Sequence, residues 1–329
     1  MLELSIALHD NERTRPILDG RVAPQGIKLI PTVVHGSEMF WRQLKFSDFD
    51  VSEMSMSSLL IATSQGDKRW AGIPVYTSRG FFHTGIQVRA DRGIKVPADL
   101  KGKRVGVPEY QQTSALWSRG ILQHEFGVKP VDIEWFMERT PDVSHGGVTG
   151  FKPPKGVKLR RIPPETNIGE MLLAGDLDAT LLYLRDPNLV DRSRADISAA
   201  PSIRRLFKDP GAEARRYYAK TGIFPINHAM VARRGVLDRH PWVALNIYKA
   251  FVEAAALLAR ESEAYLQPFL QTGLLDGAAR AGLKADPMPY GVKAARPVLE
   301  TITRYVHEQG LTKRRVALDE VFAASTMDV

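Results

Sequence analysis

A short loop carries two side chains that together could act on an aromatic acid. Arg79 and His83 stand four residues apart, in a segment that also contains Phe81, Phe82 and two glycines. A guanidinium group can hold a carboxylate through two hydrogen bonds, an imidazole titrates near neutral pH, and phenyl rings can line an apolar pocket. We therefore expect Arg79 to bind a carboxylate and His83 to transfer a proton. The alternative is structural: a buried histidine satisfied by its neighbours, and an arginine paired with one of them.

A second group of polar side chains follows a strand predicted over residues 49–52. Glu53 stands at the C-terminal end of this strand, and Ser57 and Ser58 lie in the first turn of the helix predicted next. Open α/β sheets place their ligands at the carboxyl ends of strands. Glu53 could therefore act as an acid or a base, and the two serines could hold a carboxylate. Equally, Glu53 could be a solvated loop residue, and the serines could serve only as helix caps.

The segment 102–128 predicts a strand, a polar loop and a helix in succession. Gln112 and Thr113 stand where this helix opens. The first turn of a helix has unpaired N–H groups and the positive end of the helix dipole, and both favour an anion. We expect Gln112 and Thr113 to bind a carboxylate of the ligand. The alternative is that the polar side chains of this turn only cap their own helix.

Two further segments place histidines outside the predicted helices. The segment 137–151 contains a proline and several glycines, so Arg139 and His145 are expected on a loop, where α/β scaffolds carry their chemistry. Asn227 and His228 precede a strand predicted over 229–232, in a segment that we interpret as a hinge beside a cleft. Arg139 is a candidate for carboxylate binding, and the two histidines are candidates for proton transfer. Asn227 could contact the ligand or only satisfy the backbone of the hinge.

The elements that position these residues alternate between strands and helices. Such alternation predicts mainly parallel sheets, and 329 residues suffice for two α/β domains. The segment 97–106, PADLKGKRVG, resembles the entry to the second lobe of two-lobed, hinged folds of the periplasmic-binding-protein-like type. We therefore expect a type II fold of this kind, with two α/β lobes, a two-stranded hinge and a ligand cleft between the lobes. Residues 1–103 and 228–329 are expected in the first lobe, and residues 104–227 in the second.

Composition and charge narrow the classes of function. The formal net charge is +8, but the arginines and lysines occur as scattered pairs without a long basic tract, so we do not expect nucleic-acid binding. Zero cysteines exclude disulfides, thiolate metal sites and a cysteine nucleophile. The sequence has no closely spaced set of histidines and acidic residues and no glycine-rich phosphate loop. We therefore expect no metal and no other cofactor.

The N-terminal segment and the lack of long apolar stretches bear on location. The segment 1–20 has no basic stretch followed by the apolar run of a signal peptide, and no window reaches the roughly 18 apolar residues that span a bilayer. We therefore expect a cytoplasmic protein without a membrane partner. A homo-oligomer is possible, and the sequence does not fix the oligomeric state.

Taken together, several stretches resemble one family of enzymes. The similarity is carried by the segments DGRV (19–22), FDVSEMSMSS (49–58), WAGIPVYTSRGFFHT (70–84), GKRVGVPEYQQTSALWSRGILQHEFGV (102–128), WFMERTPDVSHGG (135–147), RYYAKTGIFPINH (216–228) and HPWV (240–243). They resemble the 4,5-dihydroxyphthalate decarboxylase family. The resemblance implies a cytoplasmic carboxy-lyase of phthalate catabolism that acts on a small aromatic di-acid.

The chemistry that the resemblance implies fits these residue types. In 4,5-dihydroxyphthalate each carboxylate is para to a hydroxyl, so deprotonation of that hydroxyl pushes electron density onto the carbon that bears the carboxylate. Protonation of this carbon then releases CO₂, and the ring is its own electron sink. The resemblance assigns no individual roles, so the roles rest on chemistry. The candidates for holding the retained carboxylate are Arg79, Arg139, Ser57, Ser58, Gln112 and Thr113, and those for proton transfer are His83, His145, His228 and Glu53.

Two other classes of function remain open. A non-catalytic protein that binds small carboxylates, of the solute-binding class, would use the same fold and the same anion contacts. Another enzyme on this fold, acting on chorismate-derived carboxylates, would also fit. Turnover of hydroxylated aromatic acids separates these classes, because only the carboxy-lyase releases CO₂ from them.

Decarboxylation is expected to survive dialysis against a chelator, because the aromatic ring itself accepts the electrons of the breaking bond. The measurement is the rate of CO₂ release before and after dialysis. Activity that is lost on dialysis and restored by a divalent cation would contradict this expectation.

Overall fold

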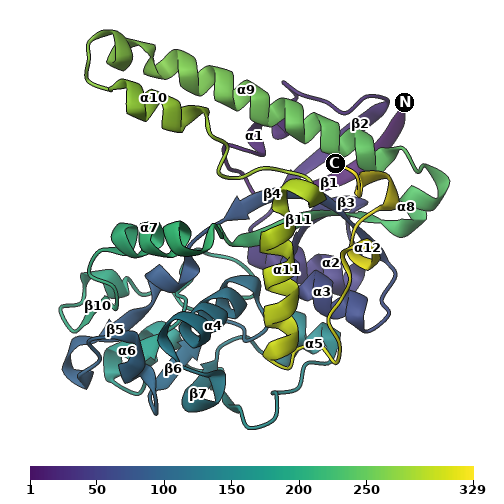
Figure 1. Cartoon of the computed structure of the whole chain (residues 1–329). Helices are drawn as coiled ribbons and strands as arrows, with labels where there is room; N and C mark the ends of the chain where they lie inside the picture. Colours follow the sequence, from purple (N-terminus) through teal and green to yellow (C-terminus); the bar gives the residue numbers. More distant parts are fainter.

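The computed structural model describes residues 1–329, including every side chain except those of residues 280, 283 and 284. Its strands form two separate sheets, each accompanied by helices, so the chain has two lobes (Figure 1). The first sheet has the order β2 (Ile27–Val33), β1 (Leu2–Leu8), β3 (Val51–Ser55), β11 (Ile226–Arg233) and β4 (Trp70–Arg79). The second has the order β10 (Ile203–Arg205), β5 (Gln87–Arg89), β9 (Ala179–Thr180), β6 (Arg104–Val107), β7 (Glu134–Met137) and β8 (Lys158–Arg161).

Both sheets are mixed, with a parallel part built as the sequence predicts. In the first lobe β1 pairs in parallel with β2 and β3, whereas β11 is antiparallel to both of its neighbours. In the second lobe β6 is parallel to β7 and β9, and β5 is antiparallel to β9 and β10. Parallel strands bring their carboxyl ends to one edge of a sheet, and loops at that edge are where such folds bind ligands.

The helices fill the connections between strands and cover the sheets. Their bounds are α1 (Arg15–Leu18), α2 (Gly36–Phe46), α3 (Met56–Ser64), α4 (Thr113–Phe126), α5 (His145–Thr149), α6 (Ile168–Ala174), α7 (Pro210–Thr221), α8 (Arg234–Arg239), α9 (Val243–Gln271), α10 (Gly277–Lys284), α11 (Val292–Glu308) and α12 (Leu318–Val321). Because parallel strands with helices on both faces are buried on both sides, every residue of β3 is buried.

The first crossing between the lobes lies earlier than the sequence suggests. Strand β5, at residues 87–89, already belongs to the second sheet, so the chain leaves the first lobe after β4 and not at residue 103. The segment 97–106 therefore lies within the second lobe and leads from a short 3₁₀ turn into β6. A strand of three residues has no alternating pattern that could be detected beforehand. The return crossing precedes β11, close to the expected residue 228.

Helix α4 joins the cores of the two lobes. Its side chains Leu116 and Trp117 belong to the core of the first lobe, whereas Leu122 belongs to the core of the second. The indole Nε1 of Trp117 donates a hydrogen bond of 2.8 Å to the main-chain oxygen of Ile226 in β11. A single rigid helix thus takes part in both cores.

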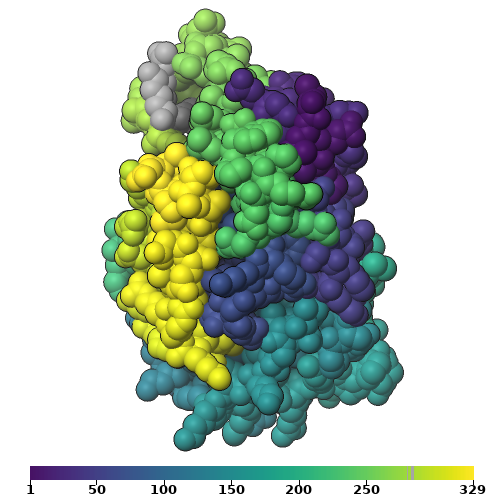
Figure 2. Space-filling model, turned by 90° about the vertical axis from the view of Figure 1, so that its right-hand side faces the viewer, coloured from purple at the N-terminus to yellow at the C-terminus, as the bar shows by residue number. Residues whose placement is uncertain are grey.

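The C-terminal helix α11 packs along this junction. In Figure 2 the yellow C-terminal segment extends over the first lobe and reaches the teal surface of the second. The ring of Tyr305 in α11 lies against Gly120 of α4, where a Cβ atom would stand only 2.1 Å from Cδ2 of Tyr305. The imidazole of His124 stacks on the same ring, with 5.0 Å between the centroids. Only glycine at position 120 permits this approach.

Gly120→Ala is expected to lower the free energy of unfolding by about 1–3 kcal/mol, because the added methyl group forces α4 away from Tyr305. Urea unfolding measures the difference. Gly235→Ala is the matched control, since a Cβ atom in that helix meets no atom within 4 Å. Equal stability of the two variants would show that the junction tolerates the extra volume.

Candidate active site

A cavity of about 250 Å³ lies between the two lobes. Its first-lobe lining comes from the ends of strands and the residues that follow them: His9, His35, Gly36, Ser37, Phe40, Ser55, Ser78, Phe82, Asn227 and His228. Its second-lobe lining is Gln112, Thr113, Ser114, Arg139, His145, Leu182 and Leu184. The cavity therefore occupies the edge at which parallel strands of both sheets end.

The carboxylate of Glu53 is fully buried and holds one of the cavity histidines. It accepts hydrogen bonds from Nδ1 of His228 at 2.9 Å, from the hydroxyl of Thr77 at 2.6 Å and from the main-chain N–H of His9 at 2.7 Å. Burial alone would raise the pKa of Glu53, but the hydrogen bond and charge of His228 and the other two donors outweigh it, so the pKa lies below its ordinary value. Glu53 is thus an ionised group that orients His228.

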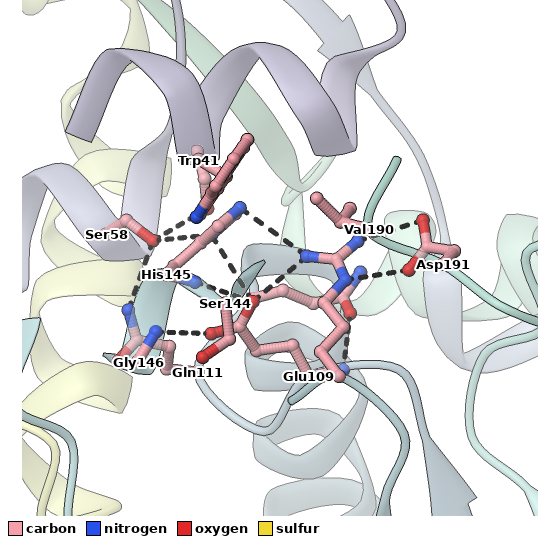
Figure 3. Close-up of polar contacts among 12 residues, drawn as sticks. Trp41, Ser58, Glu109, Gln111, Ser144, His145, Gly146, Val190 and Asp191 are labelled. Carbon is pink, nitrogen blue, oxygen red and sulfur yellow. Dashed lines mark hydrogen bonds and ion pairs between the residues drawn. The ribbon is translucent and has the colours of Figure 1, made fainter. Parts of the chain in front are cut away.

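His145 is held on the opposite wall by the start of α5. Ser144 caps this helix by accepting a hydrogen bond from the main-chain N–H of Gly147. Glu109 accepts hydrogen bonds from the main-chain N–H groups of His145 and Gly146, at 3.1 and 2.5 Å. Several of these residues surround His145 in Figure 3. Burial lowers the pKa of His145, and the charge of Arg139 adds to this effect, so the imidazole is neutral at neutral pH.

Arg139 lines the cavity, but two buried carboxylates already match its charge. It makes a bidentate pair with Asp191, with distances of 2.7 and 3.1 Å, and its Nη1 lies 3.0 Å from Glu109. Burial alone would lower the pKa of Arg139, but these carboxylates raise it above its ordinary value. The guanidinium is therefore already paired, and its position does not support the expected role of Arg139 in binding a substrate carboxylate. Its contacts instead hold Glu109 and Asp191 in place.

The serines of α3 bind the second lobe and do not line the cavity. The hydroxyl of Ser57 donates to the main-chain oxygen of Gln111 at 2.6 Å, and its main-chain N–H donates to the hydroxyl of Thr113. The hydroxyl of Ser58 lies 3.1 Å from Nδ1 of His145. The expected carboxylate-binding role of Ser57 and Ser58 is thus not supported by their position. Gln112 and Thr113, by contrast, do line the cavity at the start of α4.

Arg79 and His83 lie outside the cavity, against the expectation for both. The guanidinium of Arg79 donates to the main-chain oxygens of Phe224 and Pro289, and burial lowers its pKa to about 10. The buried Nε2 of His83 lies 3.0 Å from Glu213 of α7. Burial lowers the pKa of His83, although Glu213 acts in the opposite direction. These side chains fasten the two crossings between the lobes, a structural role that the sequence pattern does not distinguish from ligand binding.

Two of the cavity histidines were not among the sequence candidates. His9 directly follows β1, and His35 lies two residues after β2 and immediately before α2. Their rings meet edge to face with centroids 6.1 Å apart. A signal was present, because both histidines follow parallel strands at the end where ligands bind.

The side chains that the structure describes include no group of three or more His, Cys, Asp and Glu residues arranged to hold a metal ion. Within the same described part of the chain, no helix combines the length and apolar character that a membrane crossing requires.

Acidification is expected to reduce stability in a manner that depends on Glu53. Because its folded-state pKa lies below 4.5, the carboxylate adds stability above that value, and this contribution is lost as the pH falls through the lower folded pKa. Glu53→Gln cannot ionise, so its free energy of unfolding should fall less steeply below pH 4.5. Urea unfolding at stepwise pH gives both slopes, and equal slopes would contradict the assignment.

Comparisons with known proteins place the chain in a family. A family model described as NMT1/THI5 like matches residues 58–153. A 4,5-dihydroxyphthalate decarboxylase from Comamonas testosteroni is 34% identical in an alignment 332 positions long, which covers 99% of this chain and 98% of the relative. A 4,5-dihydroxyphthalate decarboxylase from Pseudomonas putida is 35% identical over 217 residues, which is 66% of this chain and 81% of the relative.

A comparison of structures agrees with the fold. The periplasmic aliphatic sulphonate binding protein SsuA from Escherichia coli aligns over 100% of both chains, with a TM-score of 0.56 and 16% identity. This likeness concerns the fold alone. Because a relative that is 34% identical aligns over almost the whole of both sequences, the chain belongs to the 4,5-dihydroxyphthalate decarboxylase family and has its two-lobed, periplasmic-binding-protein-like fold.

Proposed function

We propose that this protein is a carboxy-lyase that converts 4,5-dihydroxyphthalate to protocatechuate (3,4-dihydroxybenzoate) and CO₂, in the cytoplasm, as a step of phthalate catabolism. The proposal is supported by family membership over the whole chain and by one observation in the structure. That observation is a cavity between the lobes into which two separately held histidines, His145 and His228, both project from its walls.

The size and lining of the cavity suit a single aromatic ring with acidic substituents. Pockets for drug-sized ligands occupy about 300–1,000 Å³, so a cavity of about 250 Å³ favours a smaller molecule. Phe40, Phe82, Leu182 and Leu184 provide apolar lining for a ring, and the remaining lining residues apart from Gly36 have polar side chains. An aromatic di-acid matches this division.

The retained carboxylate fits best at the start of α4. Gln112, Thr113 and Ser114 line the cavity where this helix of 14 residues begins, so unpaired N–H groups and the positive end of the dipole are available there. Asn227 provides a further polar group on the first-lobe wall. This arrangement can hold a carboxylate without an arginine whose charge is free.

His145 is assigned as the base that takes the proton of the substrate hydroxyl. Its lowered pKa keeps a lone pair available at neutral pH. When it gains a proton, the two carboxylates near it, Glu109 and Asp191, outnumber the single cation Arg139 and can compensate the new charge. The resulting phenolate pushes electron density onto the ring carbon para to it.

His228 is assigned as the acid that protonates this ring carbon. The ionised carboxylate of Glu53 accepts a hydrogen bond from Nδ1 and orients the imidazole, so that Nε2 is the nitrogen that donates the proton. The proton forms a C–H bond at the ring carbon, and the bond to the carboxylate then breaks. Its electron pair restores the aromatic ring and CO₂ leaves, so one proton is consumed for each CO₂ released. Return of the proton from His145 regenerates the hydroxyl of the product.

His145→Gln and His228→Gln are each expected to lower kcat by about 10²–10⁴-fold, because each removes a proton-transfer group. His83→Gln is the control, since His83 is also a buried histidine but lies outside the cavity. It should reduce stability while leaving kcat within a few-fold of the parent. The measurement is release of CO₂ and formation of protocatechuate from 4,5-dihydroxyphthalate.

The same assay separates the proposal from its rivals. A panel of hydroxylated benzoates and phthalates identifies the preferred acid. Binding of 4,5-dihydroxyphthalate without CO₂ release would favour a non-catalytic binding protein. A large loss of kcat in His83→Gln with little change in the two cavity variants would overturn the assignment of roles.

A further inference from the structure

The hydroxyl of Ser58 occupies a junction between the lobes, directly behind His145. Ser58 lies on α3 of the first lobe, whereas His145 and Gln111 belong to the second (Figure 3). The oxygen Oγ of Ser58 lies 3.1 Å from Nδ1 of His145 and 3.4 Å from Nε2 of Gln111. It also lies 3.4 Å from Oγ of Ser55. Ser58 and His145, which form this contact between the lobes, are both buried.

The surroundings of His145 determine which ring nitrogen carries the proton. Its Nε2 lies 3.5 Å from Nη1 of Arg139, and a guanidinium can only donate, so this contact favours Nε2 as the accepting nitrogen. In the neutral ring the proton is then on Nδ1, the nitrogen next to Ser58. Nδ1 is also 3.8 Å from a carboxylate oxygen of Glu109, which favours the same arrangement.

The partners of Ser58 leave its oxygen free to accept this proton. The hydroxyl of Thr149 donates to Oε1 of Gln111 at 2.9 Å, so the amide is oriented with its NH₂ group toward Ser58. Ser58 therefore accepts from Gln111 and donates to Ser55. A hydroxyl has one hydrogen and two lone pairs, so one lone pair remains for Nδ1–H of His145.

We propose that Ser58 is a positioning residue that holds His145 as the Nδ1–H tautomer, so that the lone pair that a base requires is on Nε2. This inference rests on the proposed role of His145 as the base. Because the serine and the histidine come from different lobes, contact between the lobes adds Ser58 to the second-lobe groups that favour this tautomer. Ser58 thus links the closed arrangement of the lobes to the chemistry without touching the substrate.

The charged groups around His145 decide the direction of the expected pH effect. Glu109 and Asp191 favour its protonated form, as does the main chain of Ser37, whereas Arg139 opposes it. Ser58 accepts a hydrogen bond from Nδ1–H, and such a bond is stronger when the ring is charged. Loss of the hydroxyl should therefore lower the pKa of His145 below its already lowered value, and the acidic limb of the kcat profile should move to lower pH.

The decisive measurement is ¹⁵N NMR of the protein with labelled histidines, without substrate. The His145 signal is assigned by its absence in His145→Gln. In the parent it should have the shift of the Nδ1–H tautomer, and in Ser58→Ala it should move toward a mixture of tautomers. Ser58→Thr keeps the hydroxyl and should restore the parent spectrum. A parent spectrum with the proton on Nε2, or an unchanged spectrum in Ser58→Ala, would overturn the inference.

Kinetics provide the second readout. Ser58→Ala should lower kcat on the order of tenfold with little change in KM, as expected for loss of one hydrogen bond that acts in the reaction. Ser64→Ala is the matched control on the same helix, because that hydroxyl donates only to the main-chain oxygen of Ile61. A parent protein that releases no CO₂ would refute the proposed function, whereas the NMR result would still stand. Normal kcat and pH profile in a folded Ser58→Ala would refute the role of Ser58 alone.

Discussion

The buried ion cluster of Arg139, Asp191 and Glu109 is the interaction on which most of the site depends. Each of these side chains is at most 1% exposed, so each charge requires the others. Glu109 also accepts hydrogen bonds from the main-chain N–H groups at the start of α5, and these bonds fix His145. Asp191 ties Arg139 to the loop that follows β9, two of whose leucines line the cavity. Removal of one carboxylate would therefore disturb both a histidine and the apolar wall.

The contact between the lobes is the second constraint. Its residues are buried and packed as in a protein core. Trp117 of α4 is buried among first-lobe residues, and Ser57 is hydrogen-bonded to main-chain and side-chain groups of the second lobe. Tyr305 of α11 packs on Gly120 at a distance that no other residue would permit. An enzyme benefits from this rigidity, because proton transfer requires donor and acceptor at fixed positions.

The sequence predicts the fold and part of the site well, for a definite physical reason. Glu53 lies in β3. Gln112 and Thr113 follow β6, and Asn227 and His228 stand at the start of β11, so the topology of the sheets alone brings these residues near the cavity. Their exact partners, such as Thr77 for Glu53, depend on packing between distant segments. No local pattern encodes these partners.

Arg79 and His83 illustrate where sequence reasoning fails. Polar and aromatic residues in a loop with glycines are compatible with a binding loop and with a crossing between lobes, and here the loop is a crossing. Their partners Pro289 and Glu213 lie more than a hundred residues further along the chain. His9 and His35 were overlooked for the opposite reason, since each follows its strand without other candidate residues beside it, and only the fold brings the two rings together.

The side chain of Phe40 lies between two of the cavity histidines. Its ring lies against the two histidines that we propose for proton transfer, with centroids 5.9 Å from His145 and 4.5 Å from His228. A phenyl ring has no acidic hydrogen and no lone pair, so it cannot relay a proton between the two imidazoles. Each imidazole can therefore exchange a proton with the substrate without exchanging one with the other imidazole through Phe40.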